Sequence, residues 1–193
     1  MQQKSELRKY VRQCFRQTDE AQRNAWSAQI RRQLLVMPRF MQARHVMLYY
    51  ALPDEPNLLP IIKLHYDIPK TFWFPKITGE HTFVPLPYTP ELGFTTDTTP
   101  TPYHIKEPLA DSPIIQPDFD IILTPGMAFD RSGHRLGRGK GFYDRFLKTT
   151  CRSYKVGICF PYQLLDNLPV TPHDVPMDSI LTPPVFPAAL TTQ

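Results

Sequence analysis

The fold is decided by residues 120–147, which read DIILTPGMAFDRSGHRLGRGKGFYDRFL. The stretch opens with Asp120–Thr124, an apolar run of strand length. A loop rich in glycine, arginine and lysine follows, and after it Tyr143, Phe146 and Leu147 recur with the spacing of a helix. A strand, a loop and a helix in this order predict one βα unit, with the loop at the carboxyl end of the strand.

Further helices and strands are predicted on both sides of this unit. The N-terminal part is expected to form one helix over residues 3–17 and a second from Asp19 to before Pro38, with Gln22 placed as in a capping box. Apolar runs predict strands at residues 45–50, 72–74, 82–84, 154–160 and 179–182, and a short helix at 57–64 capped by Asn57. The alternation predicts a single α/β domain over residues 1–193, namely a three-layer sandwich with a mainly parallel sheet, a Rossmann-like open fold with N-terminal helices. The Pro- and Thr-rich residues 85–118 are expected to run over its surface.

Composition excludes several classes of protein. Of the 193 residues, 41% are hydrophobic and 12% aromatic, which is typical of a globular protein. The chain shows neither an apolar run long enough for a membrane span nor the apolar core of a signal peptide, and its three cysteines form no Cys-x-x-Cys motif. We therefore expect a cytoplasmic protein without a membrane contact.

The net charge of +4 is concentrated near the N-terminus, where residues 1–45 hold 10 Lys/Arg against 3 Asp/Glu. Such an excess attracts a polyanion, although the solvated face of an ordinary helix gives the same count. Lys4 and Arg8 share one face of the first predicted helix. Because cations in a first turn oppose the helix dipole, Lys4 is expected to serve something other than helix stability.

The glycine loop has the composition of a polyphosphate site. Four of the eight glycines of the chain fall between residues 133 and 141, and Arg135, Arg138 and Lys140 lie among them. Glycines let backbone N–H groups approach an anion closely, and the cations add full charges. The order of residues matches neither a Walker A motif nor a GxGxxG fingerprint. Asp144, one helical turn after Lys140, is placed to hold Mg²⁺, or alternatively to pair with a neighbouring cation, Arg145 or Lys148.

The chain resembles the 5-formyltetrahydrofolate cyclo-ligase (5,10-methenyltetrahydrofolate synthetase) family. The resemblance rests on Pro125–Asp130, on the run Gly133-x-Arg-Leu-Gly-x-Gly-x-Gly-Phe-Tyr-Asp-Arg-Phe-Leu147, and on shorter matches at Lys4-x-x-Leu-Arg8, Glu55, Ile105-x-Glu-Pro108 and His173–Asp178. It implies an ATP- and Mg²⁺-dependent ring closure of 5-formyltetrahydrofolate to 5,10-methenyltetrahydrofolate, with release of ADP and phosphate. Members of this family are expected to phosphorylate the formyl oxygen, which turns a poor leaving group into a good one.

The resemblance also implies roles for individual residues. The expected ATP contacts are Lys4, Ser5, Glu6, Leu7, Arg8, Arg135, Leu136, Gly137, Arg138, Gly139, Lys140, Gly141, Phe142 and Tyr143. The expected folate contacts are Tyr50, Glu55, Arg138, Gly139, Lys140, Gly141 and Phe142. Arg138 and Lys140 are the expected catalytic residues, because they would stabilise charge on the transferring phosphoryl group, and Asp144 and Asp174 are expected to hold Mg²⁺. Trp73 and Phe74 are candidates for the wall of the cleft and equally for the core.

Departures from the family pattern leave these roles intact. Phe142 stands where many members have a tyrosine, so stacking should persist while one hydroxyl is lost. The partner is expected to be a small molecule, 5-formyltetrahydrofolate with or without polyglutamate, and the chain a monomer. The alternatives are a family member that binds folate or nucleotide without turnover, a different enzyme on a similar scaffold, and a nucleic-acid-binding module. The last lacks aromatic residues interleaved with its basic ones, so no nucleic-acid partner is expected.

Overall fold

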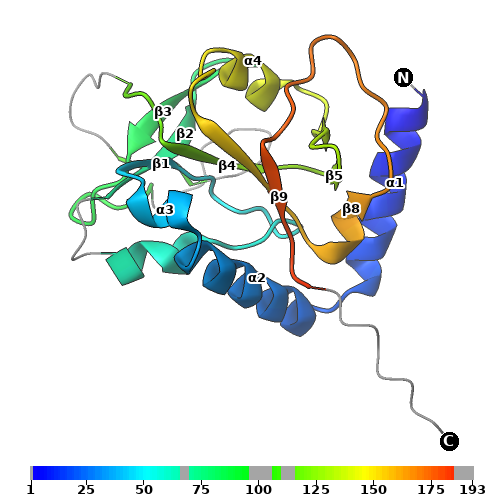
Figure 1. Cartoon of the computed structure of the whole chain (residues 1–193), viewed down its shortest axis with the longest axis horizontal. Helices are drawn as coiled ribbons and strands as arrows, with labels where there is room; N and C mark the ends of the chain where they lie inside the picture. Colours follow the sequence, from blue (N-terminus) through cyan, green and yellow to red (C-terminus); the bar gives the residue numbers. More distant parts are fainter. Residues whose placement is uncertain (1, 66–69, 96–105, 110–115, 185–193) are drawn as a thin grey trace, which may run out of the picture.

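The computed structural model describes residues 2–65, 70–95, 106–109 and 116–184. A six-stranded sheet in the order β3-β2-β1-β4-β7-β9 forms its centre (Figure 1). Its strands are β1 (His45–Met47), β2 (Thr71–Ile77), β3 (Phe83–Pro87), β4 (Ile121–Pro125), β7 (Tyr154–Ile158) and β9 (Ser179–Leu181). Every neighbouring pair is parallel except β2 and β3, so the predicted mainly parallel sheet is confirmed. Ile105 and much of the Pro- and Thr-rich segment lie outside the described residues.

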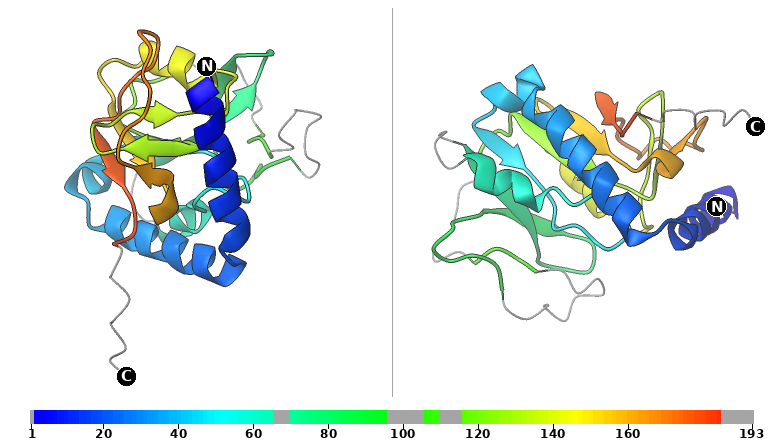
Figure 2. Two further views of the ribbon diagram at one scale, coloured as in Figure 1. Left: turned by 90° about the vertical axis from the view of Figure 1, so that its right-hand side faces the viewer. Right: turned by 90° about the horizontal axis from the view of Figure 1, so that it is seen from below.

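Helices cover the sheet on both faces. The helices are α1 (Gln2–Gln17), α2 (Glu20–Leu35), α3 (Pro38–Gln42), the 3-10 helix η1 (Leu59–His65) and α4 (Phe142–Lys148). Successive strand residues point to opposite faces, so Ile121 and Leu123 join a core under α2, α3 and η1. Ile122 instead joins a second core with Phe146 and Leu147 of α4. The two cores give the predicted three layers, with α2 and α4 on opposite sides of the sheet (Figures 1 and 2).

Both ends of α2 follow the prediction, since the helix begins after the predicted cap and stops before Pro38. Asp19 lies at the N-cap and accepts a hydrogen bond from the Gln22 N–H at 2.6 Å. The helix ends at Leu35, and Pro38 opens the short helix α3, which the sequence did not predict. A proline fits there because the first residue of a helix needs no N–H partner within the helix.

A second, three-stranded sheet was not predicted. It consists of β5 (Ala128–Asp130), β6 (Arg135–Leu136) and β8 (Leu164–Leu165), which follows the single 3-10 turn η2 (Pro161–Gln163). Strands this short show no period of two, which explains why the sequence did not reveal them. Helix α1 lies beside this sheet (Figure 2). Its Val11 is buried in one cluster with Leu136 and Met127. The N-terminal helix is thereby attached to the segment that leads into the glycine loop.

None of the helices in the described part of the chain combines the length and the apolar character that a membrane span needs.

A tight turn between β5 and β6 fixes the entry to the glycine loop. Asp130 is 2% exposed, and its carboxylate accepts hydrogen bonds from the His134 and Leu168 N–H groups and contacts the His134 ring at 2.9 Å. Gly133, at φ +88°, accepts a hydrogen bond from the Met177 N–H at 2.8 Å. A Cβ atom at Gly133 would lie 2.4 Å from the Met177 carbonyl oxygen, so no other residue fits without moving the backbone.

Gly133→Ala is therefore expected to lower the free energy of unfolding by about 3 kcal/mol, because about 1–2 kcal/mol of left-handed strain is joined by overlap with backbone. Gly93→Ala is the matched control, since Gly93 also has positive φ, +69°, but a Cβ there meets nothing within 4 Å. Gly93→Ala should lower the free energy of unfolding only by the backbone strain, about 1 kcal/mol. Urea unfolding followed by circular dichroism measures both, and equal losses would contradict the packing role of Gly133.

Candidate active site

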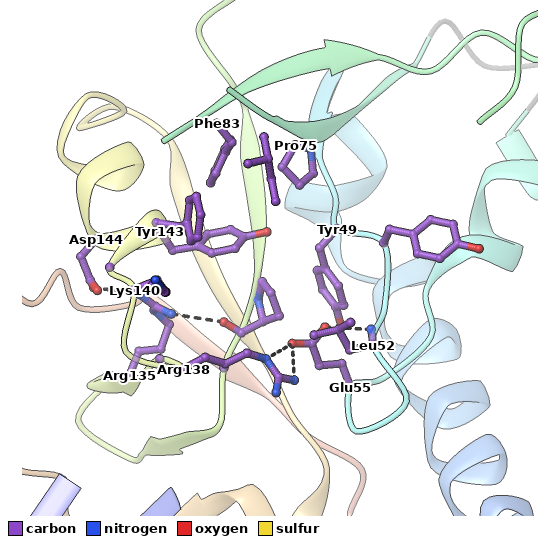
Figure 3. A pocket seen from close by; sticks show the side chains of 17 residues that line it. Tyr49, Leu52, Glu55, Pro75, Phe83, Arg135, Arg138, Lys140, Tyr143 and Asp144 are labelled. Carbon is purple, nitrogen blue, oxygen red and sulfur yellow. Dashed lines mark hydrogen bonds and ion pairs between the residues drawn. The ribbon is translucent and has the colours of Figure 1, made fainter. Parts of the chain in front are cut away.

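A cavity opens at the carboxyl ends of the parallel strands β1 and β4, where ligands bind in open α/β sheets. Its free space is about 760 Å³, counted to include the part open to solvent. Figure 3 shows its walls. They are formed by Tyr49, Tyr50, Leu52, Glu55, Pro75, Ile77, Phe83, Pro125, Gly126, Arg135, Gly137, Arg138, Lys140, Gly141, Phe142, Tyr143 and Asp144.

The glycine loop forms one wall of the cavity, as predicted. Gly139 has φ +115°, and Gly141 has φ +70° at the N-cap of α4, where no side chain caps the helix. Gly137 and Gly141 line the cavity, whereas Gly139 faces the Arg8 guanidinium, which a Cβ at this glycine would approach to 3.8 Å. The loop therefore presents backbone to the cavity on one side and to α1 on the other.

Arg135 holds the base of this wall together. Its guanidinium donates to Asp144 Oδ1 at 2.8 Å and to the Pro125 carbonyl at 3.4 Å, and it lies 5.5 Å from the centre of the Tyr143 ring. The arginine thus joins the end of β4 to the first turn of α4. The sequence left Asp144 with either a metal or Arg145 or Lys148 as partner, but its ion-pair partner in the structure is Arg135. Arg145 instead donates to the Lys140 carbonyl at 2.8 Å.

The opposite wall carries a buried carboxylate. Glu55 is 8% exposed; its Oε2 accepts from the Leu52 N–H at 3.0 Å and its Oε1 from Arg138 Nη2 at 2.9 Å. Burial raises the pKa of the Glu55 carboxyl, and the Arg138 guanidinium and the Leu52 N–H oppose that rise. Arg138 also pairs with Asp54 at 2.5 Å. Through its contact with Glu55, the guanidinium reaches from the glycine loop to the opposite wall (Figure 3). Asp54 was not among the predicted residues, although it is adjacent to Glu55 in the sequence.

Three tyrosines and two phenylalanines give the cavity its aromatic surface. The Tyr143 hydroxyl oxygen is buried and has no hydrogen-bond partner among the described residues. Burial and the Glu55 carboxylate raise the pKa of Tyr143, so its phenol stays neutral. Phe83 contacts both Phe142 and Tyr143, with ring centres 6.4 and 5.4 Å away, and Tyr50 packs edge-on against Phe94. Trp73 and Phe74, which the sequence left between cleft and core, are 5% and 0% exposed and belong to the core.

Lys140 is the cation of the site with the least structural restraint. Its ammonium lies 3.3 Å from the Glu80 carboxylate, and the two side chains are 43% and 74% exposed. An ion pair this exposed contributes little to stability, so Lys140 is free to exchange Glu80 for a ligand.

Helix α1 reaches the glycine loop from outside the cavity. The Arg8 Nε donates to the Gly137 carbonyl at 2.9 Å, and the Lys4 ammonium pairs with Asp174 Oδ2 at 2.7 Å. Burial opposes ionisation of Asp174, but hydrogen bonds from Lys4 and the Thr171 N–H outweigh it and lower its pKa. These contacts explain why cations occupy the start of α1 despite the helix dipole. Neither cation lines the cavity in this structure.

The other predicted contacts differ in position. Ser5 and Glu6 are exposed on α1, whereas Leu7 packs beside Val11 and Leu136 in the core under α1. Among the described residues, no group of three or more His, Cys, Asp and Glu side chains lies close enough together to hold a metal ion. Asp144 lines the cavity and Asp174 does not.

Comparison with known proteins agrees with the resemblance carried by the motifs. The model of the 5-formyltetrahydrofolate cyclo-ligase family matches residues 1–183. A 5-formyltetrahydrofolate cyclo-ligase of Mycolicibacterium smegmatis is 31% identical over 190 residues, which cover 93% of each chain. One of Escherichia coli (strain K12) is 29% identical over 182 residues, which cover 90% of this chain and 96% of the relative.

A solved structure leads to the same family. The NMR structure of Aquifex aeolicus 5,10-methenyltetrahydrofolate synthetase matches with a TM-score of 0.79 and 31% identity, over 92% of this chain and 88% of that one. The fold, the cavity at the strand ends and the relatives of nearly equal length are therefore consistent with one another. The chain belongs to the 5-formyltetrahydrofolate cyclo-ligase family, and it is a ligase that forms 5,10-methenyltetrahydrofolate from 5-formyltetrahydrofolate.

Proposed function

We propose that one cavity holds both reactants, with the folate against Glu55 and the phosphates of ATP along the glycine loop. The observation that carries this proposal is the pair of unlike walls. A buried carboxylate suits the N–H donors of a pterin, and a loop with Arg138 and Lys140 suits phosphates. Because the walls face each other across a single cavity, a formyl group on one side can meet a phosphoryl group on the other.

The reaction needs positioning and charge neutralisation more than covalent help from the protein. The formyl oxygen attacks the γ-phosphorus of ATP, and ADP leaves. The folate N10 then attacks the activated formyl carbon and loses its proton, and phosphate departs with the former formyl oxygen. Negative charge develops on the transferring group, so Arg138 and Lys140 are proposed to stabilise it.

The remaining predicted contacts are proposed to support the nucleotide. Gly137, Gly141 and Tyr143 line the cavity beside Arg135 and can approach the nucleotide directly. Lys4 and Arg8 contact the outer side of the loop and Asp174, so we propose that they set its shape and reach phosphate only when it closes. Leu7 and Leu136 then hold α1 in place rather than contact the nucleotide, and the exposed Ser5 and Glu6 are given no nucleotide contact. Phe142, which lines the cavity, is proposed to separate the two ligands, and Tyr50 to contact the folate, whereas Gly139 faces Arg8 and is proposed only to shape the loop.

The residues present fit Mg²⁺ as a partner of the phosphates. Mg²⁺ usually keeps several waters and takes only one or two carboxylates beside phosphate oxygens, so a larger cluster of acids is not needed. We propose Asp144 as the direct ligand, because it lines the cavity and pairs with Arg135 through Oδ1. Asp174 is committed to Lys4 and Thr171, and we propose that it acts by fixing Lys4. The ion would neutralise charge on the phosphates.

Location in the cytoplasm, a monomeric state and the acceptance of polyglutamylated folate remain predictions.

The function is tested by mixing the purified protein with 5-formyltetrahydrofolate, ATP and Mg²⁺. The methenyl chromophore should appear in the near ultraviolet, with one ADP released per product. If no more product formed than in a control without ATP, the proposed reaction would be contradicted, and a family member that binds its ligands without turnover would be favoured.

Lys140→Ala should lower kcat by about a hundredfold, because removing one donor aimed at developing charge typically costs that much. The dissociation constant of 5-formyltetrahydrofolate, measured by fluorescence titration, should change by no more than about twofold, since the folate is held at Glu55. Lys148→Ala is the control, because Lys148 is exposed on α4 and does not line the cavity. If Lys140→Ala weakened folate binding as much as it lowered kcat, the lysine would have been given the wrong role.

Asp144→Asn should raise the Mg²⁺ concentration for half-maximal rate by about tenfold or more, because one of few protein ligands is lost. Asp174→Asn should leave that concentration near the wild-type value and raise KM for ATP, because Lys4 loses its partner. Rates measured over a Mg²⁺ series at fixed ATP compare the two variants. If Asp174→Asn raised the required Mg²⁺ concentration more than Asp144→Asn does, Asp174 and not Asp144 would be the direct ligand.

A further inference from the structure

The loop between β1 and η1 presents two adjacent carboxylates to a single arginine. Arg138 Nη2 lies 2.5 Å from Asp54 Oδ1 and 2.9 Å from Glu55 Oε1, and Arg138 Nε lies 3.3 Å from the same Glu55 oxygen. Asp54 has a side chain that is 19% exposed, against 6% for Glu55. The proposed function uses Glu55 and Arg138 but gives no task to Asp54.

The hydrogen bonds of Glu55 leave no room for a second bidentate partner. An ionised carboxylate offers about four lone-pair sites, two on each oxygen. Arg138 occupies Oε1 with two contacts, and the Leu52 N–H occupies one site on Oε2. A pterin that donates one N–H to each oxygen would need a site on Oε1. Folate can therefore bind Glu55 in this way only after Arg138 has left Oε1.

The carboxylate loop is fixed, so the arginine is the partner that moves. The Glu55 N–H donates to the Leu52 carbonyl at 2.9 Å, and the Tyr49 hydroxyl donates to the Pro56 carbonyl at 2.8 Å. Gln163, which is 1% exposed, donates to the Asp54 carbonyl at 3.4 Å and to that of Gly126 at 3.1 Å. Arg138, by contrast, lies between two glycines, and its side chain is 26% exposed.

We propose that Asp54 is a positioning residue that retains Arg138 in the cavity when folate takes over Glu55. Before folate binds, two carboxylates compensate the arginine, and it has little attraction left for phosphate. When folate occupies Glu55, Asp54 alone holds Nη2, and the rest of the guanidinium is available to the γ-phosphate of ATP. This inference rests on the proposed function. It adds an order of binding, because folate prepares the site that then receives the phosphates of ATP.

The arrangement couples the two ligands. Folate should strengthen nucleotide binding, and by thermodynamic linkage nucleotide should strengthen folate binding by the same factor. Asp54 is proposed to set the position of the released guanidinium and not the affinity for folate, because the folate is bound by Glu55 and not by Asp54. Its loss should therefore appear in kcat and not in KM for folate.

The first test needs no variant. The affinity of the wild-type protein for β,γ-methylene-ATP with Mg²⁺ is measured by calorimetry with and without 5-formyltetrahydrofolate. Folate should tighten nucleotide binding at least about fivefold, the lower end of typical couplings. Arg138→Gln should abolish the coupling. Equal affinities in the wild type would overturn the proposal.

The second test compares two Asp→Asn variants with the same change of charge. Asp54→Asn should lower kcat by about tenfold, the lower end for a lost hydrogen bond between charged groups, with KM for folate within about twofold. Asp166→Asn, at an exposed site that does not line the cavity, should keep wild-type kcat. In the Arg138→Gln background, Asp54→Asn should lower kcat no further, whereas a merely structural role of Asp54 would lower it in both backgrounds.

The outcomes separate this inference from the function on which it rests. A wild type without turnover overturns both. Two results would overturn only the role of Asp54 while the wild type shows turnover. One is an unchanged kcat in Asp54→Asn, and the other is additive losses of kcat in the double variant.

Discussion

A buried carboxylate needs a cation, and the site is built around that constraint. Glu55 is buried in one wall of the cavity, where water cannot stabilise its charge fully, and Arg138 from a distant part of the chain supplies the compensation. The contact brings the loop after β1 against the glycine loop before α4 (Figure 3). Removing Arg138 would leave the buried charge of Glu55 without its counter-ion, so the wall that carries Glu55 depends on the glycine loop.

The remaining architecture sets where these two walls meet. Parallel strands β1 and β4 are neighbours in the sheet, so the segments that leave their carboxyl ends emerge side by side. The small sheet then turns the chain back through Asp130 and Gly133 before the glycine loop begins. Helix α1 packs on that sheet and touches the loop through Arg8. Each layer therefore restricts the loop from a different side while leaving its cavity face open.

Much of this arrangement follows from local sequence, and the rest follows from distant contacts. The βα unit at 120–147 and the cap at Asp19 are visible in the sequence because apolar spacing and capping residues are local signals. The charge of Lys4 is unfavourable in the first turn of a helix, which the sequence shows, but only the fold reveals its partner, Asp174. Asp144 pairs with Arg135 of β6 rather than with its helix neighbours, and only the fold reveals this contact. Asp54 carried no signal of its own, since its role depends on Arg138, and β5, β6 and β8 are too short for a period to show.

The central claim is that Glu55 exchanges Arg138 for folate and that the arginine then turns to phosphate. A crystal structure of the protein with 5-formyltetrahydrofolate, β,γ-methylene-ATP and Mg²⁺ tests this most directly. The account predicts pterin N–H groups on both oxygens of Glu55, with Arg138 still in contact with Asp54 and its free edge at the γ-phosphate. A complex in which Arg138 remains on Glu55 Oε1 while folate binds elsewhere in the cavity would contradict it.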